Sequence, residues 1–224
     1  MFFTRFAINP ARRGARLLLA SPHRMHAAVM AAFPPAATES GHAGRVLWRV
    51  DRVGHGAELF IVSPAEPDLT HLVEQAGWPT TSTWQSTEYD RFLSRLTAGQ
   101  RWAFRLTANP VHHVRCSPGT RSKPLAHVTA DQQFAWLVDR ADRLGVTFGE
   151  TPEEMARLVT LTRREVLRFS KGPETSRHRV TLGVATFDGA LTVRDADRLR
   201  GVLVNGIGRA RGYGCGLMTL ARLP

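Results

Sequence analysis

Two histidines could do chemistry, because His23 and His26 lie three positions apart in a stretch expected to be helical. The helix is predicted to begin with Ser21 as its N-cap and with Pro22 at its first position. Side chains at i and i+3 lie on the same side of a helix, with their Cβ atoms about 5–6 Å apart. An imidazole has an ordinary pKa of about 6.5, so the two residues could divide the roles of base and acid. Histidine pairs on a helix flank are, however, commonly solvated surface residues.

A glycine-rich segment near the C-terminus is the second such feature. It runs from Gly206 to Gly216 and also contains Arg209 and Arg211. Its glycines are Gly206, Gly208, Gly212, Gly214 and Gly216. Glycine adopts positive φ at little cost, and backbone N–H groups and guanidinium groups both bind phosphate oxygens, so this segment is suited to holding a phosphate. The alternative is a tight turn between the last helix and the last strand.

The glycine pattern does not match a nucleotide-binding motif. A dinucleotide fingerprint requires G-x-G-x-x-G at the start of a helix, and here Arg211 stands where the third glycine should be. No G-x-x-x-x-G-K-[ST] sequence occurs in the chain. The net charge of +11 indicates an acidic partner, and nucleic acid is the commonest of these. The phosphate is therefore predicted to belong to a nucleic acid.

The composition argues against several other classes of protein. The two cysteines, Cys116 and Cys215, form no C-x-x-C motif, so neither a zinc ribbon nor a disulfide scaffold is expected. Only 19 residues are acidic and they form no cluster typical of a two-metal nuclease, so we expect no metal and no cofactor. The N-terminal apolar run is too short for a signal peptide, and no segment reaches about 18 apolar residues. We therefore expect a soluble, cytoplasmic protein with no membrane partner.

The hydrophobic pattern predicts two successive units of similar order. The first is expected to contain strands at Phe2–Ile8, Arg45–Arg52, Leu59–Val62 and Thr83–Tyr89, a loop at Asn9–Ala20, and helices from Ser21 to Pro34 and over Asp68–Gln75. The second is expected to contain strands at Arg101–Thr107, Leu161–Phe169, His178–Phe187, Leu191–Val193 and Leu217–Leu223, a turn at Asp188–Gly189, and helices at Thr129–Gly145 and Asp195–Val204. The order βαββαβ therefore occurs about twice, which predicts an α+β fold of two tandem ferredoxin-like (RRM-like) domains, residues 1–92 and 98–224.

The hairpin predicted between Leu161 and Phe187 is basic. Arg168, Arg177 and Arg179 lie on it, and such a hairpin can enter the groove of an RNA stem or follow its phosphates. The predicted sheets carry no aromatic RNP-type motif on which bases would stack. We therefore expect RNA to be held by this hairpin, by the loops and by the helices.

Four segments carry a resemblance to a known family: Ser21–Pro34, Lys123–Leu137, Val180–Val193 and the glycine-rich tail Asn205–Met218. They are spread over nearly the whole chain. The tail alone is similar to a wide superfamily of repeat-processing proteins. The combination resembles the CasE family, the CRISPR repeat endoribonucleases of type I-E systems.

The resemblance implies tandem ferredoxin-like domains and metal-independent cleavage of precursor CRISPR RNA beside a repeat stem-loop. It also implies that the enzyme stays on the mature crRNA and joins the other subunits of the Cascade complex. In the family the catalytic histidine lies on the first helix, which corresponds to His26, whereas many relatives carry tyrosine at the position of His23.

The chemistry implied for such a site is attack of the substrate's own 2′-OH on the adjacent phosphorus. The products carry a 2′,3′-cyclic phosphate and a 5′-OH. We expect His26 to be essential, His23 to assist it, and Arg24 to stabilise the developing negative charge. The alternative is a subunit that binds an RNA stem-loop without cutting it.

Overall fold

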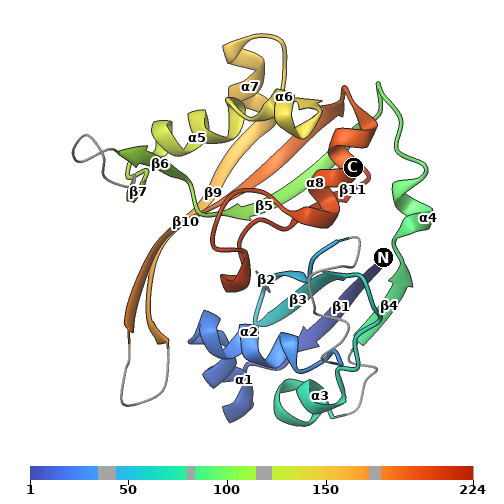
Figure 1. The fold of residues 1–224 in the computed structure, drawn as a ribbon, viewed down its shortest axis with the longest axis vertical. Coiled ribbons are helices and arrows are strands. Elements are labelled where there is room, and N and C mark those ends of the chain that lie inside the picture. The colour runs from blue at the N-terminus through green and yellow to red at the C-terminus, as the bar shows by residue number, and fades with distance from the viewer. Residues whose placement is uncertain (35–43, 80–83, 115–122, 172–177, 224) are drawn as a thin grey trace.

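The computed structural model describes residues 1–34, 44–79, 84–114, 123–171 and 178–223. Two antiparallel sheets, each with helices packed against it, make up most of the fold (Figure 1). The first half of the chain follows the order βαββαβ with its first helix divided in two, and the second half keeps that order with additional short strands and helices inserted. The prediction of two tandem ferredoxin-like units is therefore confirmed.

The N-terminal sheet has the strand order β2-β3-β1-β4. Its strands are β1 (Phe2–Ile8), β2 (Leu47–Val53), β3 (Gly56–Ser63) and β4 (Trp84–Glu88). The helices α1 (Arg13–Leu19), α2 (Pro22–Met30) and α3 (Thr70–Ala76) bury their apolar side chains in the same cluster as Phe6, Leu59 and Ile61 of the sheet. The short helix α4 (Asp90–Leu93) leads to the second sheet.

The C-terminal sheet has the order β11-β5-β10-β8, with β9 paired to β10 as well. Its strands are β5 (Arg101–Ala108), β8 (Val146–Thr147), β9 (Val159–Lys171), β10 (His178–Val193) and β11 (Met218–Ala221). Its helices are α5 (Ala130–Val138), α6 (Ala141–Leu144), α7 (Pro152–Leu158) and α8 (Ala196–Asn205), and a 3-10 turn, η3 (Arg211–Tyr213), lies in the glycine-rich segment. β6 (Val111–Val114) and β7 (Lys123–Ala126) form a separate two-stranded sheet.

The segment Asn9–Ala20 was predicted as a loop, but it contains helix α1. Ala15 and Leu18 of this helix are buried. A Cβ atom on Gly14 would lie 2.4 Å from the carbonyl oxygen of Gln75, so the glycine allows α1 to pack directly on α3. Arg, Ala and Leu favour the helix locally, and the packing on α3 adds tertiary contacts to it.

The turn predicted at Asp188–Gly189 is also wrong, because β10 runs through both residues without interruption. Asp188 accepts a hydrogen bond of 2.5 Å from Nε of Arg105 on the neighbouring strand. A Cβ atom on Gly189 would lie 1.9 Å from the carbonyl oxygen of Leu158. The glycine therefore allows a close approach of β10 to the end of α7, where β9 begins, rather than a reversal of the chain.

The long helix predicted after Thr129 begins as expected, with a capping box between Thr129 and Gln132, but it is divided into α5 and α6. Helix α7 and strand β8 were not predicted from the sequence. The helix that begins after Ser21 was predicted to extend to Pro34, but α2 ends earlier, at Met30.

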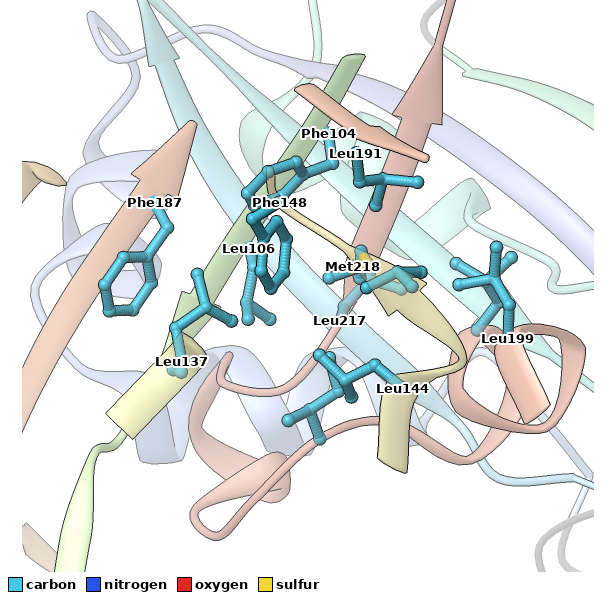
Figure 2. Packing of buried hydrophobic residues seen from close by; sticks show 14 of the residues in the cluster. Phe104, Leu106, Leu137, Leu144, Phe148, Phe187, Leu191, Leu199, Leu217 and Met218 are labelled. Carbon is cyan, nitrogen blue, oxygen red and sulfur yellow. The ribbon is translucent and has the colours of Figure 1, made fainter. Parts of the chain in front are cut away.

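Buried residues from both halves share one core. Its C-terminal part is formed by β5, β10, α5, α6 and α8, as Figure 2 shows with Phe104, Leu106, Leu137, Phe187 and Leu199. Leu47, Val62 and Tyr89 of the N-terminal half belong to the same cluster. The N-terminal half thus has a core of its own and also contributes residues to the core of the C-terminal half, and the division into residues 1–92 and 98–224 remains a proposal.

A buried guanidinium group also joins the two sheets. Arg49 of β2 is 2 % exposed and donates five hydrogen bonds, the full number that a guanidinium group can donate. Two of them go to the carboxylate of Asp51, and the others reach Arg105 O, Leu217 O and Thr219 Oγ1 on β5 and at β11. Because every donor has an acceptor, the charge is buried with its hydrogen bonds satisfied.

Helices long and apolar enough to cross a membrane are absent from the described residues.

Candidate active site

Helix α2 presents both histidines because its opposite face is buried. The Oγ atom of Ser21 accepts a hydrogen bond of 3.4 Å from the backbone N–H of Arg24, and Pro22 occupies the first helical position, as predicted. Met25 and Val29 are buried against the N-terminal sheet. His23 and His26 are left half-buried on the flank of the helix, and Arg24 is exposed.

The imidazole of His26 lies against the glycine-rich loop of residues 206–216. A Cβ atom on Gly212 would be 3.5 Å from both Cε1 and Nε2 of His26. The turn η3, which contains Gly212, lies beside α2 and β2 in the fold (Figure 1). The two features singled out in the sequence, far apart along the chain, thus meet in one place.

Burial acts on the proton equilibrium of His26. Its Nδ1 atom is buried and forms no hydrogen bond with any of the described residues. Loss of solvation, and to a lesser extent repulsion from His23, lowers the pKa of His26 below its ordinary value of 6.5. The imidazole is therefore neutral near pH 7 and able to accept a proton.

The glycines of the loop are required by its packing. Gly206, Gly208, Gly214 and Gly216 all have positive φ, a conformation that other residues adopt at a cost. A Cβ atom on Gly206 would lie 2.8 Å from Leu47, and one on Gly214 would lie 2.8 Å from the ring of Trp48. Gly212 differs from these four because its φ is not positive and its neighbour is His26. Side chains of β2 thus occupy the space that Gly206 and Gly214 leave.

The two arginines of the loop differ in environment. Arg209 is exposed, whereas Arg211 is half-buried and its Nε donates a hydrogen bond of 3.1 Å to the carbonyl oxygen of Gly208. Burial, and then the charge of Arg45, lowers the pKa of Arg211. Arg209 is thus the arginine that is accessible to a ligand.

The long hairpin of β9 and β10 extends past its sheet to the side of α2 (Figure 1). Arg168 of β9 lines a hollow together with His23 and Arg24 of α2. Arg179 lies opposite Ser170 in the strand register, on the same face of the hairpin as Arg168. Arg177 lies outside the described residues.

Other basic residues of the hairpin already have partners. Arg163 forms an ion pair of 2.7 Å with Glu165, and Arg164 donates to Gln133 Oε1 and to the carbonyl oxygen of Val128. The exposed Arg168 and Arg179 are therefore better placed than these two to bind a ligand.

Several residues that shape the site had no clear signal in the sequence. Phe169 of β9 packs its ring on Tyr213 of η3, with centroids 4.8 Å apart, so the hairpin and the glycine-rich loop are in contact. Trp48, which packs under Gly214, was expected only as one member of an alternating strand. A large aromatic residue beside a glycine far away in the sequence cannot be paired with it from one sequence alone.

Metal ligands do not gather at the site. Among the described residues, no group of three or more His, Cys, Asp or Glu side chains could hold a metal ion. Cys215 is buried, and burial raises the pKa of its thiol to about 12, so it is an unreactive core residue. Cys116 lies outside the described residues.

Comparison with known proteins gave consistent matches. A family model described as "CRISPR associated protein" matches residues 1–222. The CRISPR-associated endoribonuclease Cse3 of Thermus thermophilus is 30% identical over 225 residues, covering 99% of this chain and 100% of the relative.

Solved structures of similar proteins agree with this match. A CRISPR endoribonuclease Cse3 bound to a 19 nt RNA superposes with a TM-score of 0.74 at 28% identity, covering 98% of each chain. Thermus thermophilus Cse3 bound to an RNA representing a pre-cleavage complex gives a TM-score of 0.75 at 27% identity, again over 98% of each chain.

The lowered pKa of His26 leads to a first prediction. In the free protein, the imidazole should titrate with a midpoint below 6.5, and His23→Ala should raise that midpoint because it removes a like charge. The midpoint can be measured by NMR of the imidazole C–H signals. His55→Ala, which changes an exposed histidine in the β2–β3 turn, should leave it unchanged. A midpoint above 6.5 in the wild-type protein would contradict the burial argument.

Proposed function

The chain belongs to the family of CRISPR-associated proteins that includes the endoribonuclease Cse3, and we propose that it cleaves precursor CRISPR RNA without a metal ion. The contact between His26 and Gly212 carries this proposal, because it joins a neutral imidazole to a loop that presents Arg209. A proton acceptor and a cation beside one another are what an RNA phosphate needs in order to react with its own 2′-OH.

The proposed reaction uses no nucleophile from the protein. The 2′-OH loses its proton as its oxygen attacks the adjacent phosphorus in line, and the 5′-oxygen takes up a proton as its bond to phosphorus breaks. The products carry a 2′,3′-cyclic phosphate and a 5′-OH. His26 takes part in proton transfer, and His23 positions the 2′-OH or the phosphate from the same flank of α2. Arg24 and Arg209 stabilise the additional negative charge on the phosphate. Arg24 is exposed beside the histidines on α2, and Arg209 is exposed on the adjoining loop.

The repeat stem-loop is proposed to lie along the β9–β10 hairpin. Arg168 connects that surface to the histidines, because it lines the same hollow as His23. Arg179 extends the basic face along the hairpin, and Arg177 is proposed to continue it. After cleavage the enzyme remains on the crRNA and joins the other Cascade subunits in the cytoplasm.

A second candidate function is binding of the stem-loop without cleavage. One observation favours it: among the described residues, no acceptor orients the buried Nδ1 atom of His26, whereas catalytic histidines are commonly held by such a bond. Both functions use the same basic surface. They differ in whether the phosphate bond is broken.

Incubation of the protein with a repeat stem-loop RNA in EDTA separates the two functions. We expect cleavage at one position, with a 2′,3′-cyclic phosphate on the upstream product, because the nucleophile comes from the RNA. A matched RNA with 2′-deoxyribose at the cut site should bind and stay intact. Tight binding of the all-ribose RNA with no product would favour the non-cleaving subunit, and cleavage abolished by EDTA would indicate a metal-dependent nuclease.

His26→Ala should lower the single-turnover cleavage rate roughly 10²–10⁴-fold, the usual size of general acid–base catalysis, and change RNA affinity little. The rate is measured at saturating RNA, and the affinity with the 2′-deoxy substrate. His23→Ala should reduce the rate less, and the exposed His55→Ala is the matched control. A His26→Ala protein that cleaves at the wild-type rate would remove this residue from the mechanism.

Replacing Arg209 and Arg211 by alanine should weaken RNA binding and flatten its dependence on salt, by about one unit of slope for each phosphate that the protein no longer neutralises. Arg209→Ala alone should account for most of the change, because Arg211 is half-buried and bonded to Gly208 O. Arg91→Ala, which changes an exposed arginine paired with Glu88, is the control. An unchanged slope in the double variant would mean that the loop binds no phosphate.

A further inference from the structure

Three consecutive residues of β2 contact the glycine-rich loop at two points and the residue that follows it at a third. Leu47 lies against Gly206 at the start of the loop, where a Cβ atom would approach its Cδ2 to 2.8 Å. Trp48 lies against Gly214 near the end of the loop, where a Cβ atom would approach the ring to 2.8 Å. Arg49 donates a hydrogen bond of 3.0 Å to the carbonyl oxygen of Leu217, the residue that follows Gly216.

These three side chains are held rigidly. Leu47 is fully buried, and Trp48 and Arg49 are 3 % and 2 % exposed. The Arg49 guanidinium is fixed on its own strand by two bonds to Asp51, and it also holds Arg105 O of β5 and Thr219 Oγ1 of β11. A planar group with all of its donors used cannot rotate without breaking hydrogen bonds. The end of the loop is therefore tied to the N-terminal sheet.

His26 of α2 lies against the middle of the loop. Gly212 faces the imidazole from within η3, between the points held by Leu47 and by Trp48. The turn η3 also contacts the C-terminal sheet, because the ring of Tyr213 in η3 packs on the ring of Phe169 in β9. The position of Gly212 relative to His26 thus depends on how the ends of the loop are seated on β2.

We propose that β2 is the positioning element of the active site, and that Arg49, with Trp48, sets the register of the glycine-rich loop against His26. Neither residue touches the RNA in this role; they act through the loop. The inference rests on the proposed cleavage reaction. Displacing a catalytic group by about 1 Å lowers the rate on the order of 10²-fold, so small shifts of the loop have a measurable effect.

A substitution in the glycine-rich loop gives the sharper test of this positioning role. Gly214→Ala places a methyl group against Trp48 at a φ of +80°, and Gly54→Ala is its matched control, because Gly54 also has positive φ (+56°) but has no atom within 4 Å of the added Cβ. Both variants carry similar backbone strain, and only the first displaces the loop. We expect Gly214→Ala to cleave about 10- to 100-fold more slowly at saturating RNA, with affinity for the 2′-deoxy RNA within about threefold of wild type. Gly54→Ala should cleave like the wild type.

A rescue experiment identifies the clashing partner. Trp48→Phe removes the part of the indole ring that Gly214 faces, and it also removes a buried indole N–H that has no acceptor among the described residues. Combined with Gly214→Ala, it should restore part of the rate. The titration midpoint of His26 gives a readout that does not depend on cleavage: it should move toward 6.5 in Gly214→Ala and back in the double variant, because a displaced loop lets water reach the imidazole.

Arg49→Lys tests the same positioning role by changing a residue of β2 instead of the loop. Lysine keeps the charge but carries three N–H donors on one nitrogen instead of five on a planar fork, so it cannot make all five hydrogen bonds of Arg49. We expect a folded protein with lower thermal stability, a slower cleavage step and a shifted His26 titration. Should Gly214→Ala fail to fold, this variant carries the test alone.

The outcomes separate the two proposals. A Gly214→Ala protein that cleaves and titrates like Gly54→Ala, or an Arg49→Lys protein with a wild-type cleavage rate and His26 midpoint, would overturn the positioning role. If the wild-type protein cuts no RNA, the proposed function fails, while the His26 midpoints still report whether β2 sets the position of the loop.

Discussion

The burial of one charge constrains the whole molecule. Arg49 is removed from water, and five acceptors on β2, β5 and at β11 compensate for the lost hydration of its guanidinium group. Those acceptors belong to both sheets, so the two sheets are held in one relative arrangement. Leu47, in the same strand, extends the link by packing into the core of the C-terminal half. The site depends on this arrangement, since His26 lies on a helix packed on the N-terminal sheet and Gly212 comes from the other end of the chain.

The loop therefore has two separate requirements. Its glycines satisfy a packing requirement, since four of them have positive φ and three lie against the side chains of Leu47, Trp48 and Trp136. The loop can bind a ligand through the side chains that remain exposed after packing, above all through Arg209. Interpreting such a segment as a flexible cradle for phosphate assigns to the glycines a role that the exposed arginine fills better.

Local signals predicted local structure well. The Ser21 cap and the box between Thr129 and Gln132 are formed as expected, because each depends on residues within one turn. Helix α7 was missed although Thr151 caps it and Pro152 begins it, so one failure was of a local signal. Two other failures involve distant segments: Gly14 lets α1 pack directly on α3, and β10 continues through Gly189 with β9 paired directly beside it. In both places the sequence suggested a loop or a turn, and the packing overrode it.

What the sequence by itself determined is the chemistry available: two histidines on one flank of a capped helix, a basic chain, and a glycine-rich tail with arginines. What only the tertiary structure decided is how these parts are combined. It places Gly212 on the imidazole of His26, lowers the pKa of that group by burying it, and distinguishes the exposed Arg209 from the bonded Arg211. The physical reason is that burial and packing are properties of pairs of residues distant in the chain, and a single sequence contains the members of such pairs without pairing them.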